Sequence, residues 1–337
     1  MKIIHAANFD LRKNGAVFYA CDRKISNGMT RNGHHVYDFS YRDVARNNRQ
    51  WGSKKSGIKN MNQLFIDTVD NIRPDFIMLG HSELISLETL QHIKQNHPDT
   101  HIAQWYVDPL FSREKLGFII DRMVILDALF CTTGGEHLDM FKQKGGKAFY
   151  LPNPVDDSIE VFHNDEKTTF EYDLIFCGRD KNEKERGSFL QHLTDQLDQL
   201  RIGLRGSLGN PLVYGHGYLD LLEGSKMGLN LSRSDEYYMY SSDRIAQLTG
   251  NGLLTFTPET PGIRKLYNDD EMIFFSGLDE LIDKARYYHQ HDEERCRIAA
   301  NGRRRAHQCY NSTRLAKYML ELSLAEGASE NYEWMDS

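Results

Sequence analysis

Short apolar runs alternate with amphipathic segments along the first half of the chain. The apolar runs predict strands at residues 2–7, 35–39, 76–80, 101–107 and 128–133. Segments with helical spacing lie at residues 18–31, 62–71, 87–96 and 136–144. Because strand-like runs and helices alternate in this way, the pattern predicts a parallel sheet with helices on both faces.

The same alternation restarts after the segment Leu-Pro-Asn-Pro at residues 151–154, which cannot continue a helix or a central strand. Further strands are predicted at residues 172–178, 201–207, 227–232, 252–257 and 271–277. Further helices are predicted at residues 187–199, 279–289, 292–304 and 312–324. We therefore expect two α/β domains, at residues 1–152 and 153–325, and a polar, frayed tail at residues 326–337.

Composition narrows the class of protein. The 337 residues carry a net charge of −7, and such an acidic chain is a poor candidate for binding nucleic acid, which needs a basic face. Five cysteines without a C-x-x-C pair argue against a disulfide framework or a zinc cluster and favour a reducing compartment. The first apolar stretch is too short for a signal-peptide core, and no run of roughly 18 apolar residues occurs. We expect a cytoplasmic protein that can still touch a membrane surface.

Polar residues at the carboxyl ends of the predicted strands are the first candidates for a site, because open parallel sheets bind ligands there. With two sheets facing each other, the cleft between them is the default location. The first domain offers Asn8, Asp10, His81, Asp108, Thr132, Thr133 and Glu136. The second domain offers Arg179, Arg205, Ser232, Arg233 and Ser234.

Two stretches of the second domain fit phosphate binding. Arg179, Lys184 and Arg186 precede or open a predicted helix, where cations, free N–H groups and the helix dipole act together on an anion. The interleaved acids leave a solvated charged turn as the alternative. In the segment SSDRIAQLTGNGLLTFT, Ser242 and Arg244 can hold phosphate oxygens, and Gly252 lets the backbone approach a ligand. Ordinary helix capping also explains these serines and glycines.

The run from Tyr218 to about Leu320 resembles the CgeB-like branch of the group-1 glycosyltransferases. The similarity rests on the ordered segments YLDLLEGSKMGLNLS, SSDRIAQLTGNGLLTF and TPGIRKLYNDDEMIFF, followed by a helix pair. Upstream, QWYVDP, AFYLPNPVD and GRDKNEKER are similar to a strand end, the interdomain linker and a glycine-arginine strand end of that family. The resemblance implies a GT-B fold of two Rossmann-like domains, with parallel sheets facing a cleft. It also implies a nucleotide-sugar in the second domain, an acceptor in the first, and a last helix that packs back toward the first domain.

The resemblance assigns roles to individual residues. Arg179, Lys184, Arg186, Ser242 and Arg244 would share the donor diphosphate, while Ser232 and Gly252 would line the same site. Gln247 stands where the family has an acid that binds the donor ribose. A glutamine can still form hydrogen bonds with hydroxyl groups, but it carries no charge.

Asp108 and His81 are the candidates for catalysis. Asp108 could act as the general base that deprotonates an acceptor hydroxyl, or could be a turn residue before Pro109. His81 could take the same role, bind donor phosphate or be structural. If configuration is retained, the base role vanishes and the leaving phosphate assists.

The predicted function is that of a metal-independent glycosyltransferase with no cofactor. No D-x-D triplet occurs, and arginines and lysines can neutralise a diphosphate without a metal ion. The donor would be a nucleotide-sugar, and the acceptor a hydroxyl of a glycan, a lipid-linked saccharide or a protein, with peripheral membrane contact allowed. A nucleotide-sugar epimerase of the same fold, or a non-catalytic module that binds nucleotide-sugar or glycan, are the alternatives.

Overall fold

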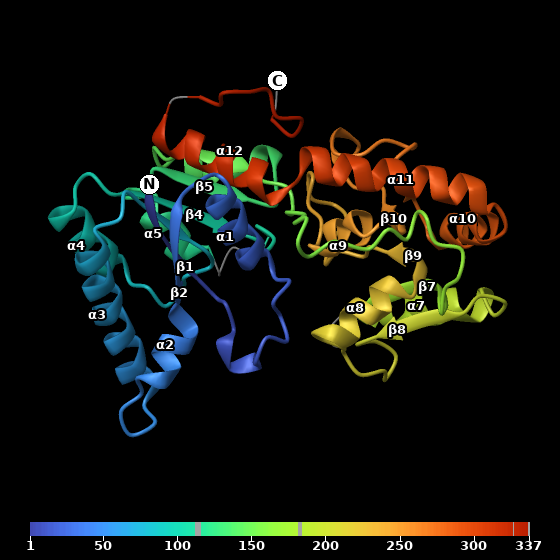
Figure 1. Ribbon diagram of the computed structural model, residues 1–337, viewed down its shortest axis with the longest axis horizontal. Helices are drawn as coiled ribbons and strands as arrows, with labels where there is room; N and C mark the ends of the chain where they lie inside the picture. The colour runs from blue at the N-terminus through green and yellow to red at the C-terminus, as the bar shows by residue number, and fades with distance from the viewer. Residues whose placement is uncertain (112–115, 181–183, 326, 336–337) are drawn as a thin grey trace. The chain divides into compact units, whose positions relative to one another are not determined.

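The structure, a computed structural model, describes residues 1–111, 116–180, 184–325 and 327–335 (Figure 1). The chain forms two compact units, Met1–Pro154 with Ser312–Ser337, and Val155–Asn311. The chain therefore leaves the first unit after Pro154 rather than after residue 152. The last helix belongs to the first unit and not to a domain of residues 153–325.

The sheet of the first unit is parallel and has the strand order β2-β1-β3-β4-β5-β6. Its strands are β1 (Lys2–Ala7), β2 (His35–Ser40), β3 (Phe76–Leu79), β4 (His101–Tyr106), β5 (Ala128–Cys131) and β6 (Ala148–Tyr150). Strands β3 and β5 are buried at every position, as expected for strands covered on both faces. The short strand β6 was not predicted, because its three residues lie in the segment assigned to the linker.

Helices of the first unit connect these strands. They are α1 (Cys21–Arg31), α2 (Tyr41–Asn47), α3 (Lys54–Ile72), α4 (Leu87–Asn96), α5 (Gly117–Arg122), α6 (Asp139–Lys142) and α12 (Ser312–Leu324), with short 3-10 turns at Leu11–Lys13 and Gly135–Leu138. Helix α3 begins well before the predicted residue 62. The reason is the cap at Ser53, whose side chain accepts a hydrogen bond from the Ser56 N–H.

Helix α12 packs closely on α1, and Gly28 permits the approach. A Cβ atom at Gly28 would lie 2.0 Å from the carbonyl oxygen of Ser312. The rest of α12 covers the sheet, where the Tyr318 ring meets Phe130 edge-on at 5.8 Å. The return of this helix to the first unit, which the family resemblance implies, therefore rests on specific contacts.

The tail after α12 is packed, so the expectation of a frayed tail is wrong for residues 327–335. Tyr332 and Trp334 are buried, and both rings lie against Tyr318. Arg314 pairs with Glu330 and Glu333, and its guanidinium lies over both rings. The acidic residues of the tail gave no indication that Tyr332 and Trp334 would be buried against Tyr318.

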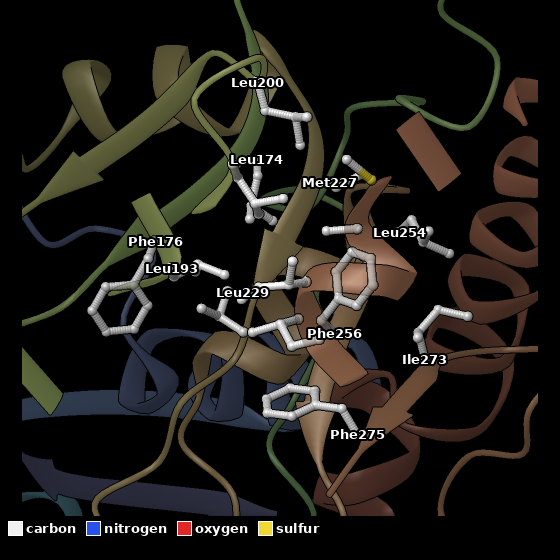
Figure 2. Close-up of a cluster of buried hydrophobic side chains, with 14 of the residues drawn as sticks. Leu174, Phe176, Leu193, Leu200, Met227, Leu229, Leu254, Phe256, Ile273 and Phe275 are labelled. Atoms are coloured by element: carbon white, nitrogen blue, oxygen red, sulfur yellow. The ribbon is translucent and has the colours of Figure 1, made fainter. Parts of the chain in front are cut away.

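The second unit has a parallel sheet with the order β11-β10-β9-β7-β8. Its strands are β7 (Tyr172–Cys177), β8 (Ile202–Arg205), β9 (Ser225–Leu229), β10 (Leu254–Pro258) and β11 (Ile273–Phe275). Its helices are α7 (Lys184–Gln196), α8 (His216–Glu223), α9 (Arg244–Gly250), α10 (Leu278–Gln290) and α11 (Asp292–Cys309), with a 3-10 turn at Ile263–Lys265. Figure 2 shows the core, in which Leu229 of β9, Phe256 of β10 and Leu193 of α7 belong to one apolar cluster. The predicted architecture of two parallel-sheet α/β domains is confirmed.

Within the described ranges, no helix is long and apolar enough to cross a membrane.

Candidate functional site

A pocket of about 830 Å³ opens in the second unit at the carboxyl ends of its strands. One wall is the first part of α7, and the others are the segments that follow β9, β10 and β11. The lining residues are Glu185, Arg186, Phe189, Leu231, Ser232, Arg233, Ser234, Asp235, Pro258, Glu259, Phe275, Ser276 and Gly277. This is the edge of an open parallel sheet at which ligands bind.

Arg186 is a fixed cation in the pocket wall. It lies in the first turn of α7, and its guanidinium donates to the carbonyl oxygens of Arg179 at 2.8 Å and Ser232 at 2.6 Å. These two bonds join the loop after β7 to the loop after β9. Because the helix start adds free N–H groups and a positive dipole end, this part of the pocket suits an anion.

Arg244 joins the end of β7 to the same loop after β9. Its Nε donates to the Cys177 carbonyl at 2.8 Å, and its Nη1 donates to the Leu231 carbonyl at 2.9 Å and to Ser242 Oγ at 2.8 Å. The guanidinium also lies 4.9 Å from the centre of the Phe176 ring. Arg244 and Ser242 are not part of the pocket lining formed by the described residues. They therefore shape the edge of the sheet, which differs from the direct phosphate contact that the sequence predicts.

A hydrogen-bonded network beneath the pocket fixes Ser232 and Ser242. The Ser242 N–H donates to Ser232 Oγ at 2.9 Å, and Ser242 Oγ donates to Asn230 Oδ1 at 3.0 Å. The Asn230 amide nitrogen in turn donates to Ser241 Oγ and Thr257 Oγ1. Since Asn230 is buried, this network joins the ends of β9 and β10 to the start of α9.

Two arginines at this edge keep their cationic groups exposed. Arg233 lines the pocket and forms no hydrogen bond or ion pair with any described residue. The Arg179 guanidinium makes a single long contact, 3.4 Å to the Tyr214 hydroxyl, among the described residues. Lys184 begins α7, but its side chain lies outside the part that the structure describes. Arg233 is thus the pocket cation most available to a ligand.

Gln247 is buried in α9 with both amide atoms engaged. Its Oε1 accepts from the Tyr218 hydroxyl at 2.6 Å, and its Nε2 donates to Asp243 Oδ2 at 3.2 Å. The side chain is therefore held between α8 and its own helix. A glutamine fits this position because it can accept from one neighbour and donate to the other.

Gly252 lies away from this pocket, which does not support its predicted part in donor binding. It precedes β10, at the amino end of the strand, whereas the pocket lies at the carboxyl ends. Its φ of +76° and a Cβ position 2.2 Å from Asp165 Oδ1 explain why a glycine is needed. Turn geometry and close packing account for the residue.

In the first unit, the structure brings His81 and Asp108 together. They follow the neighbouring strands β3 and β4, and His81 Nε2 lies 3.9 Å from Asp108 Oδ2. Their side chains are 22% and 38% exposed, so both can meet a ligand. The His81 ring also lies against Tyr106 at a centroid distance of 5.0 Å. The two candidate catalytic residues are therefore adjacent and accessible.

A buried arginine that sequence reasoning missed holds the loop after β3. Arg122 of α5 donates to the Gln104 side-chain oxygen at 2.9 Å, to the Ser82 carbonyl at 2.8 Å and to the carbonyl of Ile85. Gln104 also donates to the His81 carbonyl at 3.2 Å. Burial lowers the pKa of the Arg122 guanidinium to about 10, so it stays charged near neutral pH. A single arginine in an apolar stretch was the only signal in the sequence.

The fold and the pocket define a two-unit Rossmann-like protein with an anion-suited site in its second unit. Residues 184–321 match the family model of proteins described as glycosyl transferase-like. This segment includes α7, α9 and every residue that lines the pocket. A search of curated proteins gives no match.

Solved structures of glycosyltransferases share the fold over nearly the whole chain. HepE from Anabaena, solved in complex with UDP-glucose, has a TM-score of 0.60 at 13% identity, covering 95% of this chain and 98% of its own. Sucrose-phosphate synthase from Thermosynechococcus elongatus has a TM-score of 0.63 at 9% identity, with 96% and 98% covered. AviGT4, a glycosyltransferase involved in avilamycin A biosynthesis, has a TM-score of 0.58 at 15% identity, with 96% and 97% covered. The GT-B fold is thereby confirmed, and the family match confirms the predicted enzyme class, a glycosyltransferase.

Proposed function

We propose that the protein moves a sugar from a nucleoside-diphosphate sugar to a hydroxyl group of a glycan, a lipid-linked saccharide or a protein, without a metal ion. The observation that supports this most strongly is the pocket of about 830 Å³ at the strand ends, with Arg186 fixed in its wall and Arg233 exposed within it. The proposal includes membership in the CgeB-like branch of the family. Since HepE was solved with UDP-glucose, UDP-sugars are the first donors to test.

The arginines would carry the charge of the donor diphosphate. Arg233 and Arg186 bind its oxygens, and Ser232 offers a hydroxyl. Arg179, whose carbonyl accepts a hydrogen bond from Arg186, adds a third cation. Charge grows on the diphosphate as the bond to the sugar breaks, so cations held at this point stabilise the transition state more than the bound donor. Gln247 has a positioning role in this proposal, because its amide already joins Tyr218 to Asp243.

The acceptor is assigned to the first unit. As the acceptor oxygen bonds to the anomeric carbon, the bond from that carbon to the diphosphate breaks, and its electron pair leaves with the diphosphate. Asp108 takes the proton of the acceptor hydroxyl, and His81 lies close enough to orient the same hydroxyl. A carboxylate base at this point fits transfer with inversion, and the anomeric configuration of the product tests that assignment.

A transfer assay separates this function from its alternatives. The protein is incubated with labelled UDP-sugars in EDTA, with and without a panel of glycan acceptors, and the products are separated by chromatography. A transferase forms a new glycoside only when an acceptor is present. Conversion of the donor without an acceptor would indicate an epimerase, and donor binding without conversion would indicate a non-catalytic module.

Two variants assign the roles of the residues. Asp108→Asn is expected to bind the donor normally and to lose transfer, whereas Arg233→Ala is expected to lose donor binding. Arg304→Ala is the matched control, because it removes an arginine from a different surface pocket of the same unit. Equal loss of donor binding in Arg233→Ala and Arg304→Ala would show that Arg233 is not a specific part of the donor site.

A further inference from the structure

The hairpin formed by α2 and α3 in the first unit is strongly basic. Residues 42–59 contain six lysines or arginines and a single acid, Asp43, in a chain whose net charge is −7. Two of the cations are paired, Arg42 with Glu83 and Arg46 with Asp43. The other four are exposed and form no ion pair or hydrogen bond through their side chains with the described residues; they are Arg49, Lys54, Lys55 and Lys59.

An exposed tryptophan stands in the turn between the two helices. The accessible fraction of Trp51 is 104%, so the indole contacts none of the surrounding chain. Its φ of 51° is in the left-handed region, which costs a residue with a side chain about 1–2 kcal/mol. A large apolar ring without packing in a strained backbone does not stabilise the fold. The residue therefore needs an explanation outside the folded chain.

Hydrogen bonds close the turn that presents Trp51. The Gln50 N–H donates to Ser56 Oγ at 2.9 Å, and Ser56 Oγ donates back to the Ser53 carbonyl at 2.9 Å. The two helices approach closely at Gly57, where a Cβ atom would lie 2.1 Å from the Ala45 carbonyl oxygen. These contacts hold together the backbone of the tip that carries Trp51 and the four unpaired cations.

The tip extends from the carboxyl edge of the sheet, the edge at which His81 and Asp108 lie. Helix α3 leads into β3, and its 19 residues span about 28 Å, against about 13 Å for the four residues of β3. Its first turns therefore extend past the carboxyl edge of the sheet, and α2 and α3 run together to their shared turn (Figure 1). At the base of the hairpin, the Tyr41 hydroxyl donates to Glu83, in the loop that carries His81.

We propose that this tip docks on an anionic lipid surface. Trp51 enters the headgroup region, where indole rings are favoured because one part is apolar and the N–H remains hydrated. The four unpaired cations bind lipid phosphates, and the lysine stems extend toward them along the surface. Docking turns the edge with His81 and Asp108 toward the membrane. An acidic glycan or a nucleic acid could bind the cations and stack on the indole, but sites for single strands combine several aromatic side chains with a groove that follows the backbone. This tip protrudes and carries a single aromatic residue, Trp51, so the observations favour the membrane.

Vesicle binding tests the proposal with the intact chain. The protein is mixed with vesicles of phosphatidylcholine alone or with phosphatidylglycerol added, and bound protein is measured by sedimentation. Trp105 and Trp334 are already buried, so a blue shift of the emission on binding reports Trp51. We expect binding to the anionic vesicles, weakening with salt, and a blue shift that brominated lipids quench.

Three variants make the test specific. Lys54→Glu/Lys55→Glu is expected to weaken binding by about 25-fold or more, since each cation near an anionic surface contributes about fivefold. Lys144→Glu/Lys147→Glu is the matched control, with the same change of net charge at other exposed lysines of this unit, and is expected to bind like the wild type. Trp51→Gly is expected to fold at least as well, because glycine accepts a φ of 51°, yet to bind more weakly and without the blue shift.

Three results would overturn the proposal. The wild type could ignore anionic vesicles, the tip variants could bind them as well as the control does, or the chain could bind heparin or RNA at a salt concentration at which vesicles are not bound.

Discussion

Replacing Arg244 by alanine should destabilise the second unit and not only its ligand site. The guanidinium joins the end of β7, through the Cys177 carbonyl, to the segment after β9, through the Leu231 carbonyl. It also covers one face of Phe176, a core residue. The substitution leaves both carbonyl oxygens without this partner and exposes part of the ring.

The magnitude follows from these contacts. A hydrogen bond to a charged donor contributes about 1.5–3 kcal/mol, and the cation above the ring about 0.5–1 kcal/mol. Because the side chain is half-buried, water can replace part of what is lost. We therefore expect the free energy of unfolding of the second unit to fall by about 2–4 kcal/mol. Arg244→Lys should recover less than half, since an ammonium group cannot reach both carbonyls as the planar guanidinium does.

The two units can be followed separately during urea unfolding. All three tryptophans, Trp51, Trp105 and Trp334, belong to the first unit, so tryptophan fluorescence reports that unit, while far-ultraviolet circular dichroism reports both. For Arg244→Ala we expect the part of the dichroism change that comes from the second unit to shift down by about 1 M urea, while the fluorescence transition stays unchanged. An unchanged dichroism transition, or an equal shift of both signals, would refute this account of Arg244.

Three further substitutions test the packing and the charges of the two units. Gly28→Ala should destabilise the first unit by about 1–3 kcal/mol, measured by fluorescence, because the new methyl group overlaps the Ser312 carbonyl; in an isolated helix the same change would stabilise. Burial lowers the pKa of His5, so the unfolded chain binds more protons than the folded chain below pH 6.5. The free energy of unfolding of the first unit therefore falls as the pH falls, by up to about 1.4 kcal/mol per pH unit from this group. His5→Gln should make the free energy of unfolding less dependent on pH in this range. Gln247→Glu should lower the melting temperature at neutral pH, because it replaces the donor to Asp243 with a second carboxylate, and a rise in melting temperature would contradict the observed hydrogen bonds.

Local patterns were enough to predict most elements of the fold. The bounds of α4 and α12 agree with the predicted ranges 87–96 and 312–324, since each helix has an apolar stripe and begins just after or at a serine. The position of His81 and Asp108 at one edge of the sheet also followed from the pattern, because parallel strands end at the same edge. Their contact at 3.9 Å is visible only in the structure. Arg233 was identifiable for the same reason, as a polar residue just past a strand.

Contacts between distant segments were not predictable from those patterns. Arg244 resembles a ligand-binding cation, but the carbonyls that it binds are 67 and 13 residues away along the chain. The tail was expected to be frayed because it is acidic and polar, and the pairing of Arg314 with Glu330 and Glu333 is visible only once the tail folds back. The position of Gly252 was not predictable either, because a glycine in a turn looks the same in the sequence whether it precedes or follows a strand.

Calorimetric titration of the protein with UDP, first in EDTA and then with magnesium, measures the proposed donor pocket most directly. The account predicts binding with the same dissociation constant in both conditions, and a loss of at least about tenfold in Arg233→Ala, consistent with removal of a charged contact. GDP, ADP, CMP and dTDP, titrated in the same way, show whether another base is preferred. Failure of every nucleotide to bind, or binding that requires magnesium, would contradict the central claim of a metal-independent nucleotide-sugar site in the second unit.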